Sequence, residues 1–206
     1  MLEPTPVALV LRGLRCQRGG RVLFPAQDRS LTTGSAVWLR GTNGSGKTTL
    51  LRVLAGLGQA AQGTFECRLP RLYLGHANGL KEDLTVGESL RWASALAGLT
   101  PAPAAIEGAL SAFGLRRLQH RPVRTLSQGQ RRRTALARLA LPSPRPALWL
   151  LDEPFDALDT EGVAALVTCM REHCAQGGAV LYTSHLVVPN LPSAPWDLQA
   201  LAGGAP

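Results

Sequence analysis

The sequence predicts an α/β fold with a largely parallel sheet and a helical insertion, and three observations lead to it. The segment GTNGSGKT stands between a strand pattern and a helix pattern. The segment ALWLLDE is an almost continuous apolar run that ends in two acids, as expected for a parallel strand buried on both faces. Strand patterns alternate with helix patterns along the chain, which is typical of helices packed on such a sheet.

The individual elements follow from apolar periodicity and from the glycines and prolines between them. Strands are expected at residues 7–11, 35–40, 71–76, 147–153 and 179–185. Helices are expected at residues 48–57, at 85–118 with a break at 99–105, and at 161–174. We therefore expect a single domain over residues 1–190, with a helical insertion at about 85–140. Residues 191–206, rich in Pro, Ala and Gly, are expected to form a loose C-terminal tail.

The net charge of the chain gives little information about its function. The 206 residues carry a net charge of +8, which suits nucleic acid or an anionic membrane surface. Lys47 and Lys81 are the only lysines among the 22 basic residues, so the charge reflects a chain-wide preference for Arg. Net charge by itself therefore selects no partner.

The cysteines and the apolar runs indicate a compartment. Four cysteines without a C-x-x-C pair favour a reducing, cytoplasmic environment. Cys169 and His173 share a helix face, but a metal site needs more ligands, so we expect structural roles for both. The apolar run near the N-terminus is too short for a signal peptide, and no run of about 20 apolar residues predicts a membrane span.

The segment from Gly41 to Thr48 matches the phosphate-loop pattern G-x-x-x-x-G-K-[ST] in the strand–loop–helix context that the pattern requires. Its backbone N–H groups are expected to form an anion-binding nest at the positive end of the helix dipole. We expect Lys47 to reach the β- and γ-phosphates and the Thr48 hydroxyl to bind Mg²⁺. The expected nucleotide-binding residues of this segment are Gly41, Thr42, Asn43, Gly44, Ser45, Gly46, Lys47, Thr48 and Thr49.

A pair of acids ends the apolar run at residues 147–151. Asp152 is expected beside the phosphate loop, where its carboxylate can hold Mg²⁺. Glu153 is placed to polarise the attacking water as general base. Acids are common at sheet rims, so this pair indicates a nucleotide site only together with the phosphate loop.

The segment TLSQGQRRRTALARLAL at residues 125–141 admits three interpretations by itself: a nucleic-acid-binding helix, a charged surface, or half of a nucleotide site. On a helical wheel Arg131 and Arg138 share one side, whereas Arg132 falls among Ala135, Leu136 and Leu139. This is not the clean basic stripe that binding to a phosphate backbone favours.

Residues 126–130, LSQGQ, resemble the signature sequence of the ATP-binding subunits of ABC transporters, with Gln in place of the first Gly of L-S-G-G-Q. Residues 156–159, DALD, resemble the D-loop of that family, and His185 resembles its switch histidine. The resemblance implies a P-loop ATPase core sheet with a helical signature subdomain, and ATP with Mg²⁺ as cofactors. The resemblance further implies that Lys47, Glu153 and His185 are the catalytic residues.

The resemblance also implies a partner, a second copy of the chain. Ser127, Gly129 and Gln130 would begin a helix that faces the γ-phosphate held by the other copy, so that two copies close head-to-tail around two ATP molecules. His185 would contact the γ-phosphate from its own copy. Most of the arginines at 131–138 then have structural or surface roles.

Two positions depart from the family pattern. Arg18 stands where the family has an aromatic residue on the adenine, and a guanidinium plane can also stack on a base. His76 stands where the family has the Q-loop glutamine, and an imidazole can still meet Mg²⁺-bound water.

The segment YLGHANGLKEDLTVGESL at residues 73–90 is similar to the haem-exporter type of ABC ATP-binding subunit, which serves cytochrome c biogenesis. This resemblance implies a membrane permease as partner, with docking near residues 76–100, and a peripheral location on the cytoplasmic face of the inner membrane. ATP hydrolysis would then drive haem export or the release of a haem-loaded chaperone.

Two alternatives remain open at this point. One is the ATP-binding subunit of another small-molecule ABC transporter. The other is a soluble ABC protein that acts on nucleic acid, a class that usually has long coiled-coil insertions or two ATP cassettes. Here about 80 residues separate Lys47 from Ser127 and there is one cassette, so no nucleic-acid partner is expected.

Overall fold

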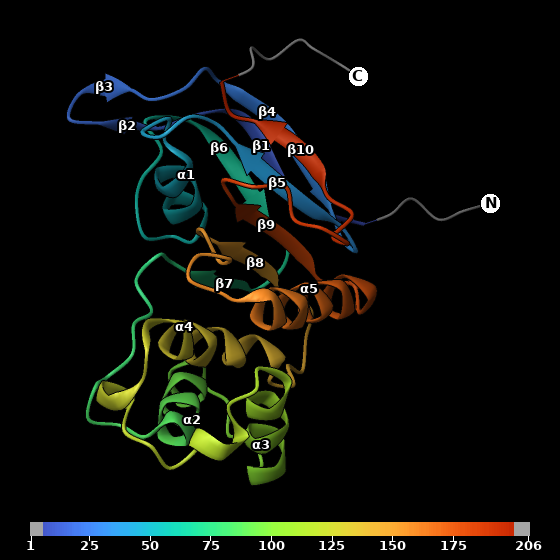
Figure 1. Ribbon diagram of the computed structural model, residues 1–206. Helices are drawn as coiled ribbons and strands as arrows, with labels where there is room; N and C mark the ends of the chain where they lie inside the picture. The colour runs from blue at the N-terminus through green and yellow to red at the C-terminus, as the bar shows by residue number, and fades with distance from the viewer. Residues whose placement is uncertain (1–5, 200–206) are drawn as a thin grey trace. The chain divides into compact units, whose positions relative to one another are not determined.

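The computed structural model describes residues 6–199, which cluster into two compact units (Figure 1). The first unit comprises residues 6–76, 145–154 and 170–199 of the described range, and the second comprises residues 77–144 and 155–169. The first unit contains all the strands of the described residues. The helices of the expected insertion lie in the second unit.

A five-stranded parallel sheet organises the first unit (Figure 1). Its order is β10 (Ala194–Asp197), β5 (Ala36–Arg40), β9 (Ala179–Thr183), β8 (Leu148–Leu151) and β7 (Arg71–Leu74). Every residue of β8 and β9 is buried, which explains their continuous apolar runs. Because all neighbouring pairs are parallel, the loops that follow β5, β8 and β9 emerge at the same edge of the sheet.

A three-stranded antiparallel sheet and a short hairpin complete this unit. The sheet has the order β4 (Gln27–Thr32), β1 (Val7–Arg15) and β6 (Gln62–Cys67), and the hairpin joins β2 (Gln17–Arg18) to β3 (Arg21–Val22). Neither β4 nor β6 was expected. Their sequences, QDRSLT and QGTFEC, are largely polar because both strands lie at the sheet edges and bury few side chains.

Helix α1 (Lys47–Leu54) connects the two sheets through one apolar core. Leu50, Leu51 and Leu54 of α1 are buried, and the same core includes Leu9 of β1 and Leu150 of β8. The helix that begins at the phosphate loop is therefore anchored on both sheets, which limits the freedom of the loop.

The C-terminal segment is not the loose tail that its composition predicted. Within residues 191–199, β10 pairs in parallel with β5, and the Leu198 N–H donates to Arg40 O at 3.0 Å. Trp196 is 6% exposed, and its Nε1–H donates to Gln27 Oε1 at 2.9 Å. The expectation of a loose tail is wrong for these residues because two apolar side chains, Trp196 and Leu198, find burial against the core. Residues 200–206 lie outside the described part of the chain.

We expect Trp196→Phe to lower the free energy of unfolding by about 1–3 kcal/mol, since the buried Gln27 Oε1 then loses its donor. Urea unfolding of the purified chain measures the change. Trp92→Phe is the matched control, because Trp92 is 37% exposed and lies outside the buried core. Equal losses in both variants would contradict an ordered role for the C-terminal strand.

The second unit is built from helices α2 (Val86–Leu96), α3 (Pro103–Ala112) and α4 (Gln128–Ala137), with short 3₁₀ turns at Arg116–Leu118, Val123–Thr125 and Arg138–Ala140. Thr85 caps α2 in a capping box with Glu88, and Pro103 begins α3 at the position where a helix tolerates proline. The three helices pack on one another through buried side chains such as Leu90, Leu110 and Leu136. Helix α5 (Thr160–Ala175) begins in this unit and ends in the first.

The arginines of α4 make contacts within the second unit. Arg131 pairs with Glu82 at 3.0 Å, and Arg133 pairs with Asp159 at 3.0 Å. Arg132 is 3% exposed and donates to Asn78 Oδ1 at 3.1 Å. These contacts give Arg131, Arg132 and Arg133 structural roles, in line with the interpretation of the arginine run from the resemblance.

His173, near the end of α5, is enclosed in the first unit. Its ring stacks on Trp149 with centroids 3.7 Å apart, and its Nε2 is hydrogen-bonded to Ala147 O at 2.8 Å. Gly178 is required opposite the ring, because a Cβ there would collide with the imidazole. Burial lowers the pKa of His173 from its usual 6.5, and the bond to the Ala147 carbonyl opposes the change only in part.

We expect this histidine to make stability fall in mild acid. Above pH 6.5 it is neutral in both the folded and the unfolded chain, so its contribution is constant. Below pH 6.5 the unfolded chain takes up the proton first, and stability declines by at most about 1.4 kcal/mol per pH unit until the lowered folded pKa is reached. Urea unfolding at pH 7.5 and pH 5.5 should show a weaker pH dependence in His173→Phe than in the wild type. An unchanged dependence would refute this source of acid sensitivity.

Candidate nucleotide site

The phosphate loop leaves the sheet at the end of β5 and leads directly into α1. Gly46, the last residue before the helix, has φ +101°, a conformation that favours glycine. A Cβ at this position would lie only 2.9 Å from Leu23 Cβ and from Phe24 Cδ1. Position 46 therefore needs glycine for both conformation and space, and the loop is held close to residues 23–24.

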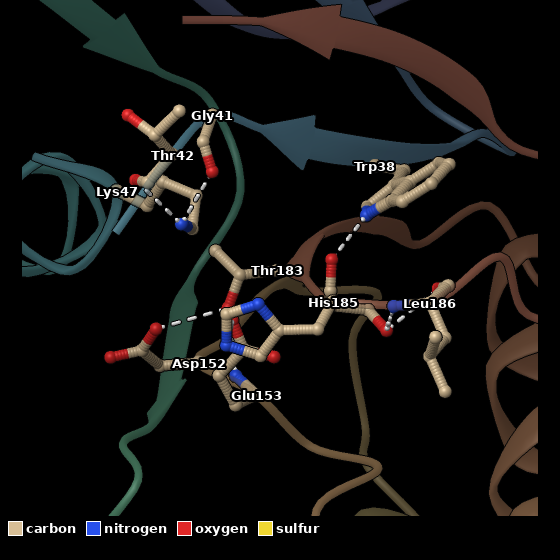
Figure 2. Close-up of polar contacts among 10 residues, drawn as sticks. Trp38, Gly41, Thr42, Lys47, Asp152, Glu153, Thr183, His185 and Leu186 are labelled. Atoms are coloured by element: carbon tan, nitrogen blue, oxygen red, sulfur yellow. Dashed lines mark hydrogen bonds and ion pairs between the residues drawn. The ribbon is translucent and has the colours of Figure 1, made fainter. Parts of the chain in front are cut away.

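Lys47 lies across the loop that precedes it (Figure 2). Its Nζ donates to Gly41 O at 2.8 Å and to Thr42 O at 3.2 Å. An ammonium group has three N–H donors, so these two carbonyls hold it in place and one donor remains for an anion. The positive charge thus lies at the N-terminal end of α1, which also attracts anions.

A cavity of about 350 Å³ opens at this loop. Its lining residues, all in the first unit, are Arg18, Leu23, Asn43, Gly44, Ser45, Gly46, Lys47, Thr48, Thr49, His76, Asp152, Glu153 and His185. Apart from Leu23, each of them was expected from the sequence to contact nucleotide, metal or reacting water. Gly41 and Thr42 do not line it but contribute the carbonyls that hold Lys47.

Ser45 indicates what the cavity binds. Its side chain is 5% exposed, and its Oγ has no hydrogen-bond partner among the described residues. A buried hydroxyl without a partner is costly, and a phosphate oxygen would satisfy it. The loop therefore fits a phosphate-bearing ligand.

The two acids lie at the end of β8. Asp152 is 3% exposed, and its N–H donates to Leu74 O at 2.8 Å. Glu153 has φ +46°, which is unusual for a residue other than glycine and is frequent at functional sites. The Thr183 hydroxyl bonds both residues, donating to Asp152 Oδ1 at 3.0 Å and accepting the N–H of Glu153 at 2.7 Å.

His185 lies beside Glu153, with 3.6 Å between its Nε2 and Glu153 Oε1 (Figure 2). The side chain of Glu153 is 13% exposed and that of His185 is 57% exposed. The imidazole thus contacts the acid from the solvent side of the cavity. Trp38 supports this loop, because its Nε1–H donates to the carbonyl of Ser184, the residue before His185.

The oxygen donors of the cavity suit Mg²⁺ when a phosphate is also present. Thr48 and Asp152 both line the cavity, and Mg²⁺ usually takes one or two protein oxygens together with phosphate oxygens and water. Within residues 6–199, no cluster of three or more His, Cys, Asp or Glu is arranged to hold a metal by itself.

Ser127, Gly129 and Gln130 lie in the second unit, at the start of α4. Ser127 Oγ accepts the Gln130 N–H at 3.3 Å, and Gln130 Oε1 accepts the Ser127 N–H at 3.0 Å, so the two form a capping box. A Cβ at Gly129 would approach Ala157 O to 3.1 Å, which places the DALD segment next to this helix start.

Sequence reasoning missed Leu23, Trp38 and Thr183. Leu23 has no signal, because it approaches the cavity only through the packing of the segment after β3 against Gly46. Trp38 and Ser184 are 146 residues apart in sequence. Thr183 lies two residues before His185 in the segment YTSH, so the sequence shows its position but not its hydrogen bonds.

The fold and this cavity define a P-loop nucleotide-binding protein. A family model described as "ABC transporter" matches residues 27–156, more than half of the chain. The chain belongs to the ABC transporter family and is an ATP-binding, ATP-hydrolysing member of it.

Relatives and solved structures agree with that family. The chain is 44% identical to the cytochrome c biogenesis ATP-binding export protein CcmA of Pseudomonas syringae pv. tomato, over 99% of this chain and 100% of the relative. It is 45% identical to the protein of the same name from Pseudomonas putida, over 88% and 90%. An ABC transporter ATP-binding protein from Pyrococcus furiosus has the same fold, with a TM-score of 0.80 and 21% identity over 92% and 96% of the two chains. An ABC transporter ATP-binding subunit matches with a TM-score of 0.81 and 24% identity over 93% and 86%.

Among the helices of residues 6–199, none combines the length and the apolar character that crossing a bilayer requires.

Proposed function

We propose that the chain is the ATP-hydrolysing subunit of an ABC complex that serves c-type cytochrome biogenesis. The observation that carries the proposal is the match in identity and length to relatives named for that process, together with phosphate-loop residues 43–49 and the acids Asp152 and Glu153 around one cavity. ATP hydrolysis then drives haem export or the release of a haem-loaded chaperone. The chain acts at the cytoplasmic face of the inner membrane, attached through its partner.

The chemistry we propose uses the residues of the cavity. Lys47 and the loop N–H groups bind the β- and γ-phosphates, and Thr48 with Asp152 would hold Mg²⁺, which would neutralise phosphate charge. Glu153 accepts a proton as water adds to the γ-phosphorus. The bond from the γ-phosphorus to the bridging oxygen breaks, ADP leaves with the electron pair, and the proton passes on to solvent. His185 contacts the γ-phosphate held by its own copy, and the imidazole of His76 would meet water bound to Mg²⁺.

The active form we propose is a head-to-tail dimer. Ser127, Gly129 and Gln130 lie at the N-terminal end of α4, where N–H groups and the helix dipole favour an anion. In the dimer they contact the γ-phosphate bound by the phosphate loop of the other copy. Each copy then supplies what the other lacks.

The remaining partner we propose is a membrane permease that docks near residues 76–100. Helix α2 lies in this range and exposes the apolar side chain of Leu96, which is 69% exposed. The range begins at His76, which lines the cavity, so a docked partner has a direct connection to the nucleotide.

A covalent-haem stain of c-type cytochromes tests this function. A strain that lacks the chain is complemented with the wild type or with Lys47→Ala. We expect the stained bands to vanish and only the wild type to restore them. Bands that persist without the chain would overturn the cytochrome assignment and favour an ABC transporter for another small molecule, to be identified from the permease that co-purifies.

A further inference from the structure

The end of β9 carries a hydroxyl that is bonded to both acids of the cavity. Thr183 is fully buried and does not line the cavity itself. Its Oγ1–H donates to Asp152 Oδ1 at 3.0 Å, and the same oxygen accepts the N–H of Glu153 at 2.7 Å (Figure 2). A threonine hydroxyl has a single donor, and here that donor is directed at the carboxylate.

Each of these two bonds constrains an acid in a different way. The bond to Oδ1 selects one orientation of the Asp152 carboxylate, because a carboxylate that rotates away would leave the buried O–H donor of Thr183 without this acceptor. The bond from the Glu153 N–H supports a backbone with φ +46°, which a residue with a side chain adopts only when its surroundings stabilise it. The two bonds therefore fix the Asp152 carboxylate and the Glu153 backbone separately.

The chain after Thr183 is held as well. The Trp38 indole donates to Ser184 O at 3.0 Å, and Ser184 Oγ accepts the Leu186 N–H at 3.1 Å. His185 stands between these anchored residues, with its imidazole 3.6 Å from Glu153. Thr183 thus connects Asp152 and Glu153, which follow β8, to the loop that carries His185.

We propose that Thr183 is a positioning residue for ATP hydrolysis, orienting Asp152 toward the metal and Glu153 toward the attacking water through one hydroxyl. The proposal rests on the roles proposed above for the two acids. It predicts that loss of the hydroxyl slows the chemical step much more than it weakens binding of ATP, because the phosphate loop is unchanged.

The test compares Thr183→Val, which keeps the volume and removes the hydroxyl, with Thr183→Ser, which keeps the hydroxyl. In the full chain we expect Thr183→Val to lower kcat by about 10- to 100-fold and to leave KM for ATP within about threefold. The Mg²⁺ concentration that half-saturates the Mg²⁺-dependent binding of a non-hydrolysable ATP analogue, measured by fluorescence, should rise in the same variant. Thr183→Ser should recover kcat to within about threefold of the wild type.

A wild-type kcat in Thr183→Val would overturn the proposal. A Thr183→Ser variant as slow as Thr183→Val would also overturn it, since the hydroxyl alone would then not sustain hydrolysis. If a thermal melt shows that Thr183→Val is unfolded, Thr183→Cys, which has only a weak S–H donor, replaces it in the test. The proposal then requires that kcat be lower in Thr183→Cys than in Thr183→Ser. Glu153→Gln runs alongside. A slow Glu153→Gln with a normal Thr183→Val overturns this inference alone, whereas a normal Glu153→Gln overturns the proposed base and this inference with it.

Discussion

Glu153→Gln is expected to bind ATP with near wild-type affinity and to hydrolyse it about 10²- to 10⁴-fold more slowly, the range that general-base catalysis usually contributes. The amide keeps the shape of the side chain but cannot accept the proton of the attacking water. The backbone N–H of residue 153 still donates to Thr183, so the φ +46° conformation and the second acid, Asp152, remain in place. The loss is therefore chemical rather than structural. Steady-state ATPase rates and nucleotide binding by fluorescence measure the two effects separately.

The matched control is Glu161→Gln, an exposed acid in the first turn of α5 that does not line the cavity. It should leave kcat within about twofold, since exposed surface changes are usually close to neutral. Because hydrolysis is blocked, Glu153→Gln with ATP should also elute as a dimer in gel filtration, which tests the head-to-tail assembly. Normal turnover in Glu153→Gln would rule out this residue as the base.

Lys47→Ala is expected to weaken nucleotide binding by about 1.5–3 kcal/mol, roughly 10- to 150-fold in Kd, the usual contribution of hydrogen bonds to a charged group. The ammonium group, which Gly41 O and Thr42 O orient, is the only lysine charge that lines the cavity. The kcat should fall by a further 10²- to 10³-fold, because in the proposed mechanism the same charge stabilises the transferring phosphoryl group. Isothermal titration with ATP and a phosphate-release assay give the two quantities.

Arg52→Ala is the control for this change, since Arg52 is an exposed basic residue of the same helix that does not line the cavity. It should bind ATP as the wild type does. A Lys47→Ala chain that binds and hydrolyses ATP normally would show that the cavity is not the nucleotide site.

Sequence reasoning predicted the elements whose signals are contiguous. The phosphate loop needs Gly46, Lys47 and Thr48 at fixed spacing, and its geometry follows from the backbone of one short segment. The buried strands β8 and β9 are recognisable in the sequence, because a strand covered on both faces is read as a nearly continuous apolar run. Asp152, Glu153 and His185 follow these two parallel strands, so the topology of the sheet places them at one edge.

The elements that were missed depend on partners far away in sequence. Strand β10 contains Pro195, which a sequence argument takes as a break, yet proline is tolerated because β10 is the edge strand and pairs only with β5. The burial of Trp196 against Gln27 requires a contact across 169 residues. No local pattern carries such information.

The sequence by itself determined that this chain folds as an α/β nucleotide-binding protein of the ABC family and which residues line the cavity at the phosphate loop, because those features are encoded within segments of ten residues or so. Only the tertiary structure decided how the acids are oriented and what holds the edge of the sheet. Thr183 meets Asp152 and Glu153 across about 30 positions, and Trp38 meets Ser184 across 146. Such contacts form between strands that become neighbours on folding, so their chemistry is a property of the packed sheet.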